Sequence, residues 1–156
     1  YKRYYPFNQG KVLRLEKKII FDLKGDGKYM LKGVPDRVVQ AEDDTYEIHD
    51  YKTSARLPAQ KLLDGDRQLA LYLIGVRSIW QAAKKVKLIW HYVVFDKEIV
   101  STRTNAELDK LKNDTASLID QIESTAEFLP KESRLCPWCD YLDLCPKCKH
   151  PFTKLE

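Results

Sequence analysis

The spacing of apolar residues changes twice along this chain, and this change constrains the fold more than any other feature. Apolar and polar side chains alternate over 12–23, which is the pattern of a half-buried strand, and a hairpin turn and a polar turn then lead to two further strands, 29–40 and 46–52. Over 59–80 the apolar residues recur at helical spacing, and 86–95 is apolar on both faces, as in a central strand. The order of these segments predicts an α/β fold with a mixed sheet flanked by helices.

The first three strands are expected to form an antiparallel meander. The sequence GDG at 25–27 contains Asp-Gly, the strongest short signal for a hairpin turn. Pro35 has no N–H to donate to a ladder, so the second strand is expected to be bent, bulged or at a sheet edge there.

A short edge strand at 99–103 and a second helix are predicted to follow. Thr104 and Glu107 form a capping box, which begins a helix, and Pro130 is expected to end it. Gly65 is expected to make the first helix irregular. The second helix is expected to bury six apolar residues: Leu108, Leu111, Leu118, Ile119, Ile122 and Phe128.

Length and charge narrow the class of protein. The chain has 156 residues, the size of one domain, and its net charge of +4 permits a polyanionic partner without requiring one. Basic residues and tyrosines are interleaved over 1–18, which suits a nucleic-acid surface but equally a solvated strand face. No apolar run approaches the roughly 18 residues of a membrane-spanning helix, so no membrane partner is expected.

Two carboxylates and one lysine form the constellation with the clearest chemistry. Asp50 and Lys52 are two residues apart in a strand and therefore share a face, while Asp36 lies beside the disturbance at Pro35. A divalent cation between the two acids would relieve their repulsion, and oxygen ligands favour Mg²⁺ or Mn²⁺. Lys52 could then orient a water and offset developing charge. The alternative is an exposed ion pair of little consequence.

Three short motifs give these residues a narrower context. They are GVPDR at 33–37, IHDYKT at 48–53 and QLALY at 68–72. In their order and approximate spacing the chain resembles the PD-(D/E)xK nuclease superfamily, in particular the RecB-type branch. That branch includes the AddB nuclease domain and the CRISPR-associated iron–sulfur exonucleases. The resemblance extends over about 12–148 and implies a restriction-endonuclease-like core with a C-terminal cysteine metal loop.

The resemblance assigns roles to individual residues. It implies that Asp36 and Asp50 are metal ligands, with the carbonyl of Tyr51 as a third, and that Lys52 is the catalytic lysine. It also implies that two residues on the helix border the active site and the nucleic-acid path: Gln68 and Tyr72. These two are four residues apart, so they lie on one helix face.

The chain also departs from the branch. A metal-ligating histidine usually lies on a helix upstream of the first strand, and nothing here matches it. His49 faces away from Asp50 and His91 lies in the central strand, so both are expected to be structural. Glu16 resembles an acidic residue of the first strand but could equally be a surface acid. We therefore expect the 156 residues alone to be a weak or inactive nuclease that an upstream extension restores.

All four cysteines lie within 13 residues of one another, at Cys136, Cys139, Cys145 and Cys148. One tight cluster indicates a metal site in a reducing compartment, here the cytoplasm, rather than a disulfide scaffold. The first three are similar to the C-terminal cysteines of the iron–sulfur nucleases in the branch. Either a 4Fe–4S cluster takes its fourth ligand from further upstream, or Cys148 completes a local site, with Zn²⁺ as the alternative metal.

The predicted organisation is a nuclease core over 1–130 with a metal-binding segment over 131–156 on the same domain. The predicted function is metal-dependent, exonuclease-like hydrolysis of DNA, with single strands or free ends as substrate. The branch suggests DNA repair, recombination or CRISPR adaptation, with a larger complex as candidate partner. The alternatives are an inactive nucleic-acid-binding module and a zinc-ribbon-type interaction domain.

Overall fold

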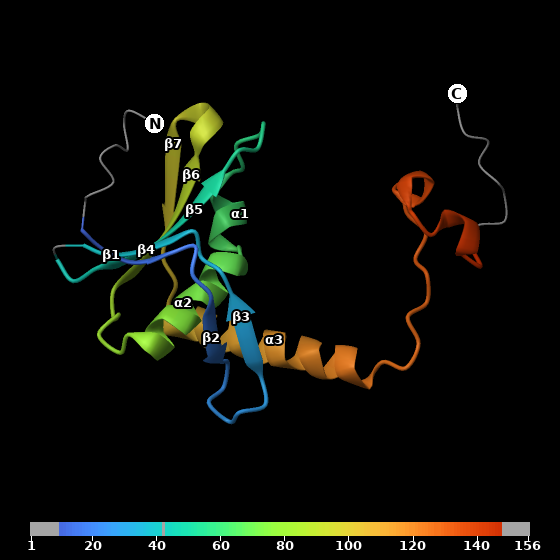
Figure 1. Ribbon diagram of the computed structural model, residues 1–156, viewed down its shortest axis with the longest axis horizontal. Coiled ribbons are helices and arrows are strands. Elements are labelled where there is room, and N and C mark those ends of the chain that lie inside the picture. Colours follow the sequence, from blue (N-terminus) through green and yellow to red (C-terminus); the bar gives the residue numbers. More distant parts are fainter. Residues whose placement is uncertain (1–9, 42, 148–156) are drawn as a thin grey trace. The chain divides into compact units, whose positions relative to one another are not determined.

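The computed structural model describes residues 10–41 and 43–147, and the chain divides into two compact units, 1–120 and 121–156. The first unit contains a five-stranded sheet (Figure 1). In spatial order its strands are β1 (Lys11–Leu15), β4 (Arg37–Gln40), β5 (Tyr46–Lys52), β6 (Val86–Tyr92) and β7 (Lys97–Ser101). Among the described strands, only β5 and β6 pair in parallel, because the segment that joins them is a helical crossover. The sheet is therefore mixed, as predicted.

The two long strands expected at the start of the chain are each divided between two sheets. The chain leaves β1 at Glu16, whose φ of 47° is in the left-handed region, and continues as β2 (Ile19–Asp22). It then returns as β3 (Met30–Gly33) and bends at Pro35 into β4. β2 and β3 pair only with each other. The expected disturbance at Pro35 is confirmed, whereas a meander of three continuous strands is wrong.

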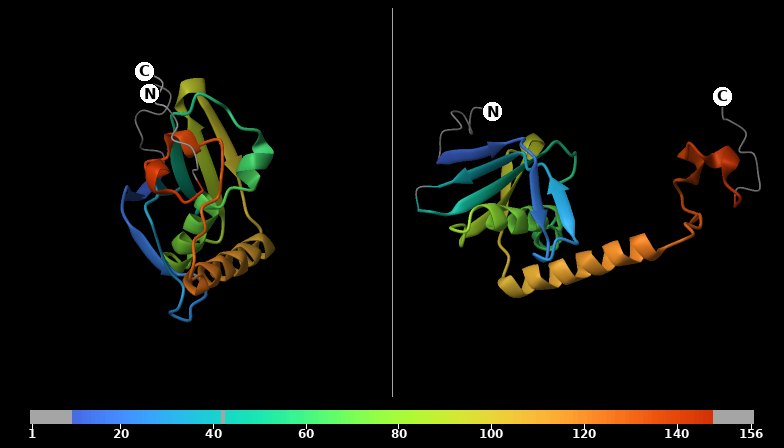
Figure 2. Two further views of the ribbon diagram at one scale, coloured as in Figure 1. Left: turned by 90° about the vertical axis from the view of Figure 1, so that its right-hand side faces the viewer. Right: turned by 60° about the horizontal axis from the view of Figure 1, so that its bottom comes forward.

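Two helices connect β5 to β6 where one irregular helix was expected. They are α1 (Gln60–Asp64) and α2 (Gln68–Ile79), separated at Gly65. Figure 2 shows α2 lying across the sheet, and α2 also packs against β2. The approach is close, since a Cβ at Gly75 would lie 2.6 Å from Cδ1 of Phe21. Gly75 therefore allows β2 to pack directly on the helix.

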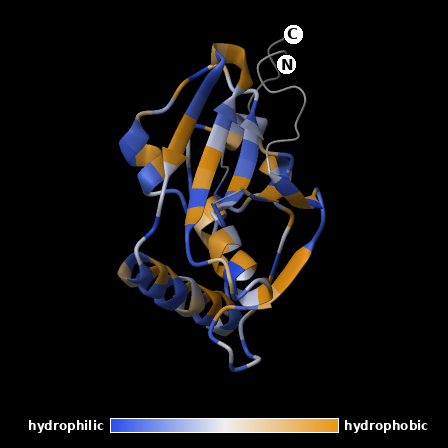
Figure 3. Cartoon of the chain, turned by 90° about the vertical axis from the view of Figure 1, so that its left-hand side faces the viewer, coloured by the Kyte–Doolittle hydropathy of each residue, from blue (hydrophilic) through white to orange (hydrophobic). Residues whose placement is uncertain are grey.

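The core of the first unit lies on the α2 side of the sheet. Alternate residues of β5 and β6 point into it, among them Ile48, Leu88 and Trp90, all at most 1% exposed. Figure 3 shows the matching alternation of hydrophilic and hydrophobic positions along the strands. The prediction that 86–95 contains a buried central strand is confirmed for β6, and the chain beyond it forms a short 3₁₀ turn, Val93–Phe95.

The capping box begins α3 (Asn105–Ser124) as predicted. The Thr104 N–H donates to Glu107 Oε2 at 2.7 Å, and the Glu107 N–H donates to Thr104 Oγ1 at 3.2 Å. The helix ends at Ser124 rather than at Pro130. Burial also differs from the expectation, because only Leu108 and Ala116 are fully buried, with Leu111 and Ile119 packed partly against the core. Three of the residues expected to be buried are at least 45% exposed: Leu118, Ile122 and Phe128. Ile122 and Phe128 come after Ile119, the last residue of α3 that packs against the core, and Leu118 lies on the other side of Leu108 from Ala116 around the helix.

The second unit has little regular structure beyond the end of α3. It contains two 3₁₀ turns, Cys136–Trp138 and Leu142–Leu144. Across the described parts of both units, no helix combines the length and apolar character needed to cross a membrane.

Candidate active site

The end of the β4–β5 ladder creates the site. The two strands pair as far as Arg37 opposite His49, so the next hydrogen-bonded positions would be Pro35 and Tyr51. Pro35 has no N–H, and the Tyr51 N–H donates to Oδ2 of Asp36 at 2.9 Å instead. A side-chain carboxylate thus takes the place of a ladder acceptor, which fixes Asp36 beside the middle of the DYK sequence.

The carbonyl of Tyr51 is directed to the same side. In an extended strand the N–H and C=O of one residue point the same way, and the N–H of Tyr51 points to Asp36. Pro35 cannot donate to this carbonyl, because proline lacks an N–H. The sequence Pro-Asp therefore leaves one backbone oxygen without its ladder donor and holds a carboxylate next to it.

Asp50 and Lys52 occupy the face of β5 that looks toward the core side. The Lys52 Nζ lies 2.7 Å from Oδ2 of Asp50, whose side chain is 8% exposed, whereas the lysine side chain is 36% exposed. This oxygen is buried and receives no hydrogen bond of ordinary geometry, so the lysine ammonium is its main polar neighbour. The predicted same-face placement of the two residues is confirmed.

Carboxylates outnumber ammonium groups around Asp50 and Lys52. Burial raises the pKa of the Asp50 carboxyl, Asp36 and Asp66 raise it further, and Lys52 opposes the change. Burial works against the charge on Lys52, but Asp50, Asp66 and Asp36 together raise the pKa of its ammonium group. Lys52 is therefore held in its charged form. Three carboxylates beside one ammonium favour an additional cation.

Asp66 and Tyr92 are near the site and were not found from the sequence. The Asp66 carboxylate accepts a hydrogen bond from the Leu69 N–H at 3.1 Å and so caps the start of α2. Arg103 donates to the Asp66 carbonyl at 3.2 Å.

Tyr92 pairs with Lys52 in the β5–β6 register. Burial raises the pKa of Tyr92, Lys52 lowers it, and Asp50 and Asp66 add to the increase. The cap position just before the QLALY motif was a usable signal for Asp66; Tyr92, within an apolar run, gave none.

Gln68 and Tyr72 lie together on α2, as their spacing predicts. Gln68 is exposed and its Nε2 donates to the Tyr72 hydroxyl at 3.4 Å. The Tyr72 ring lies over Gly33, where a Cβ would contact Cε1 of the ring and come within 2.9 Å of Cδ1. The glycine of the GVPDR motif and the tyrosine of the QLALY motif are thus one packing unit, and this unit is beside the bend that leads to Asp36.

The side chains of three other residues named in the sequence analysis, Glu16, His49 and His91, do not face the site. The Glu16 side chain is exposed, but its backbone N–H donates to the Asp36 carbonyl at 2.9 Å and so supports that residue. His49 and His91 are buried on the opposite face of the sheet from Asp50 and are hydrogen-bonded to each other at 2.8 Å. Their placement matches the expectation that His49 faces away from Asp50.

The donor set of Asp36, Asp50 and Tyr51 fits a hard divalent cation. Two carboxylates and one carbonyl are oxygen ligands of the kind that Mg²⁺ and Mn²⁺ take, with waters completing the coordination. The buried, weakly satisfied oxygen of Asp50 and the carbonyl that Pro35 leaves without a donor are both suited to a metal. Within the described ranges, no cluster of three or more Cys, His, Asp or Glu side chains could hold a metal ion, so the carbonyl and waters are needed.

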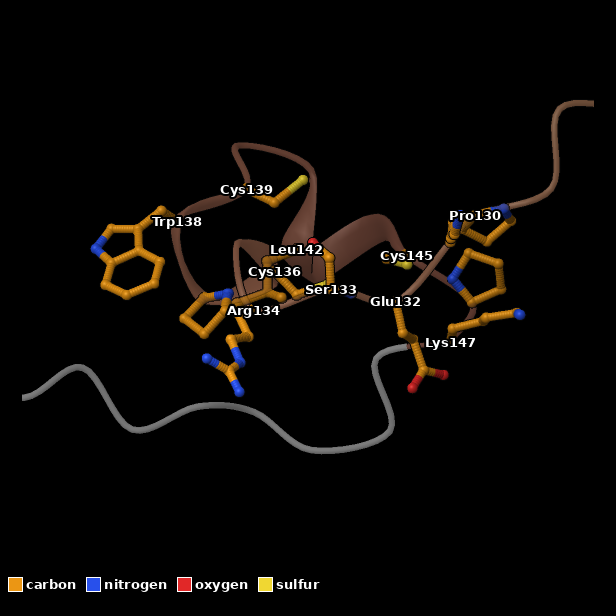
Figure 4. Close-up of a pocket in the computed structure, with 13 residues that line it drawn as sticks. Pro130, Glu132, Ser133, Arg134, Cys136, Trp138, Cys139, Leu142, Cys145 and Lys147 are labelled. Atoms are coloured by element: carbon orange, nitrogen blue, oxygen red, sulfur yellow. The ribbon is translucent and has the colours of Figure 1, made fainter. Parts of the chain in front are cut away.

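The cysteine segment shows a different arrangement. Cys136, Cys139 and Cys145 are free and line one hollow of about 900 Å³ in the second unit (Figure 4). As far as the chain is described, these three thiols do not form a group that could hold a metal. Cys148 lies outside the described residues, as do residues 1–9 of the basic N-terminal segment. The predicted four-cysteine site is therefore not assembled by the described residues.

Comparison with known proteins bears on the fold and the family. A family model for the PD-(D/E)XK nuclease superfamily matches residues 5–146. A solved structure described as "Crystal structure of SSO0001" aligns with a TM-score of 0.47 and 21% identity, covering 85% of this chain and 60% of that one. No curated protein sequence matches. The mixed sheet with its helices is consistent with the restriction-endonuclease-like architecture that the sequence predicts.

Proposed function

Because this chain belongs to the PD-(D/E)XK nuclease superfamily, we propose that it is a Mg²⁺- or Mn²⁺-dependent deoxyribonuclease that hydrolyses phosphodiester bonds. The observation that carries the proposal is the junction of β4 and β5. There the Tyr51 N–H holds Asp36 at 2.9 Å, and Lys52 lies 2.7 Å from the buried carboxylate of Asp50. Superfamily membership supports a nuclease; the choice of DNA as substrate is our proposal.

Asp36, Asp50 and the Tyr51 carbonyl would hold the cation, which supplies Lewis-acid stabilisation of charge on the phosphate oxygens when bound. Lys52 is the candidate catalytic residue. Its raised pKa keeps an ammonium group at the site, where it can orient a water and stabilise negative charge that develops on the phosphate. Asp50 holds this ammonium in place through their ion pair.

Gln68 and Tyr72 are proposed to border the path of the nucleic acid. The exposed amide of Gln68 can form a hydrogen bond with a phosphate or a base. The half-buried Tyr72 ring offers an aromatic surface on which a base can stack. We propose a RecB-type exonuclease that acts on single strands or free ends, in DNA repair or CRISPR adaptation and within a larger complex. These finer statements rest on the three motifs.

We also propose that residues 1–130 form the nuclease core, that 131–156 form a metal-binding segment, and that the protein acts in the cytoplasm. Cys136, Cys139, Cys145 and Cys148 would bind an iron–sulfur cluster or Zn²⁺. The support for this site is the spacing of the cysteines and their free state in the described segment.

The experiment that tests the function is digestion of four substrates with Mg²⁺ or Mn²⁺. They are end-labelled single-stranded DNA, circular single-stranded DNA, a duplex with blunt ends, and RNA of the same sequence. Cleavage of the linear single strand, with the circle spared, supports an exonuclease.

The control variant is Lys97→Ala, which removes another lysine of the same sheet. Lys97 is exposed and pairs with Tyr92 in register, and the variant should cleave as the wild type does. Binding of DNA without cleavage in either metal would favour the inactive module.

A further inference from the structure

A chain of four polar side chains crosses the sheet behind the candidate active site. Glu47 Oε2 lies 3.3 Å from Nε2 of His49, and Nδ1 of His49 is hydrogen-bonded to Nε2 of His91 at 2.8 Å. Nδ1 of His91 lies 3.2 Å from Oε1 of Glu98. The chain thus runs across β5, β6 and β7, and a carboxylate stands at each end.

The two imidazoles are deeply buried. His49 is 7% exposed and His91 is 3% exposed. Burying a polar ring costs free energy unless its nitrogens have partners. The bond between the two rings has hydrogen-bond geometry, whereas the outer nitrogens have a carboxylate oxygen within 3.3 Å but out of hydrogen-bond alignment. The other charged groups on this face are Arg37, opposite His49 in the register, and Lys87, whose Nζ lies 3.8 Å from Glu47. The position of the His91 ring is therefore determined from several sides.

The His91 ring is also stacked on Tyr51. The ring centroids are 4.6 Å apart and the planes differ by 15°, while the His49 and His91 rings stack at 5.1 Å and 13°. Tyr51 pairs with His91 in the parallel register of β5 and β6, so the stacking joins two side chains on the same face. The Tyr51 ring is therefore held against a fixed, buried partner.

The backbone of Tyr51 is the part of β5 that the candidate metal site uses. Its N–H orients the Asp36 carboxylate, and its neighbours on the other face are Asp50 and Lys52. A shift of the Tyr51 ring therefore moves a peptide that contacts one metal ligand and supplies another. β4 gives this residue no ladder support, because its partner position is Pro35.

We propose that His91 is a positioning residue for the Asp36–Asp50–Lys52 site. Its ring is hydrogen-bonded to His49 and lies 3.2 Å from Glu98, and it holds the Tyr51 ring from behind the sheet, so it supports β5 where Pro35 removes a ladder bond. This inference rests on the proposed function for its consequence in catalysis, but its first effect is on metal affinity. Groups that orient ligands in this way change metal affinity about 10- to 100-fold when they are removed.

The test is the dissociation constant of Mn²⁺, measured by calorimetry without DNA, for the wild type and a set of variants. His91→Ala removes the ring and should raise the constant about 10- to 100-fold. His91→Phe keeps a ring to stack on Tyr51 but loses the hydrogen bond to His49, so it should recover part of the affinity. The matched control is Val100→Ala, on the same face of β7 and 45% exposed, which should bind Mn²⁺ as the wild type does.

A second substitution tests the same contact from the other side. Tyr51→Leu removes the stacked ring but keeps the backbone groups, so it should weaken Mn²⁺ binding as His91→Ala does. The double variant should be no weaker than the weaker single variant, because both remove one contact. Should His91→Ala not fold, as judged by circular dichroism, Tyr51→Leu and His91→Phe decide the question.

The proposal is overturned if folded His91→Ala or Tyr51→Leu binds Mn²⁺ with the wild-type constant. It is also overturned if His91→Phe is as weak as His91→Ala, since stacking would then not be the cause. A wild type that binds Mn²⁺ but does not cleave DNA would defeat the proposed function and leave this inference standing. A wild type that does not bind Mn²⁺ would defeat both.

Discussion

Two sites in this chain are predicted from residue spacing to bind a metal, and they differ in whether the fold brings their ligands together. At the end of β5, strand pairing and one side-chain hydrogen bond bring Asp36, Asp50 and Lys52 together. In the cysteine segment, the three described thiols share a hollow but form no metal-holding group. The described residues bring the first site together without a metal, whereas the three described thiols of the second do not form a metal-holding group.

The surroundings of the two sites explain this difference. Asp50 lies in a strand between two paired neighbours, above a core of fully buried side chains. Around the cysteines, four large apolar side chains are 70–81% exposed: Leu135, Trp138, Tyr141 and Leu144. The described side chains around the thiols are exposed and do not hold them in place by packing, so a bound metal would itself have to order them. Ligand spacing alone thus predicts a preformed site only where a core supports it.

The largest expected effect separates the two sites by metal removal. A structural metal contributes about 10 kcal/mol or more to the folding of such a segment. Removing it with a chelator, or replacing Cys139 by Ser, should make 131–156 sensitive to protease. The Mn²⁺ affinity of the strand site should not change, since that site uses oxygen ligands. Elemental analysis that finds neither iron nor zinc in the native protein would break the comparison.

The second prediction concerns Lys52, which is expected to act on charge rather than to bind metal. Lys52→Ala should lower the cleavage rate about 10²- to 10³-fold, as loss of one group that stabilises developing charge does. Its Mn²⁺ affinity should be retained, because neither carboxylate is removed. Single-turnover rates and calorimetry on the same preparation distinguish these effects. A variant that cleaves normally would show that the ion pair with Asp50 is structural.

The third prediction concerns the contact between Gly33 and Tyr72, which packs beside the strand site. Gly33→Ala places a methyl group against the Tyr72 ring and should lower stability by about 1–3 kcal/mol. Tyr72→Ala makes room for the methyl group, so the double variant should lose less than the sum of the two single variants. Denaturant unfolding of all four proteins measures this coupling. Additive losses would mean that Gly33 and Tyr72 are not one packing unit.

The smallest expected effect is at the capping box of α3, away from both sites. Thr104→Ala should cost about 1 kcal/mol of stability. Hydrogen bonds from Thr104 lower the pKa of Glu107, so this stabilisation is present above the ordinary pKa of glutamate and is lost as the pH falls through the lowered value. The difference between the variant and the wild type should therefore shrink in acid. Mn²⁺ affinity should stay the same.

The sequence predicted those features of the fold that a short local pattern determines. The polar turn that ends before Tyr46 placed β5 at 46–52, the capping box placed the start of α3, and Gly65 marked the break before α2. The sequence did not predict that the first strand would divide at Glu16, because the left-handed backbone there belongs to a residue type that rarely adopts it. Where α3 stops being buried depends on the extent of the core, which no local pattern contains.

The candidate site was predictable in part for a similar reason. Asp50 and Lys52 follow from the period of a strand, and Pro35 marked the place where Asp36 is redirected. Tyr92 and the stacking of His91 on Tyr51 depend on the register of β5 with β6, which are joined by two helices. Register between strands that are distant in sequence is set by the assembled sheet and cannot be read from either strand alone.

The junction of β4 and β5 is proposed to be a metal-dependent nuclease site. The most direct test is cleavage of an end-labelled single-stranded oligonucleotide in Mn²⁺ by the wild type, Asp50→Asn and the control Lys97→Ala. Asp50→Asn keeps the shape of the side chain and removes one ligand charge. We predict slow cleavage by the wild type and the control, as expected for these 156 residues alone, and none by Asp50→Asn with its fold retained. Cleavage by Asp50→Asn at the wild-type rate would contradict this proposal.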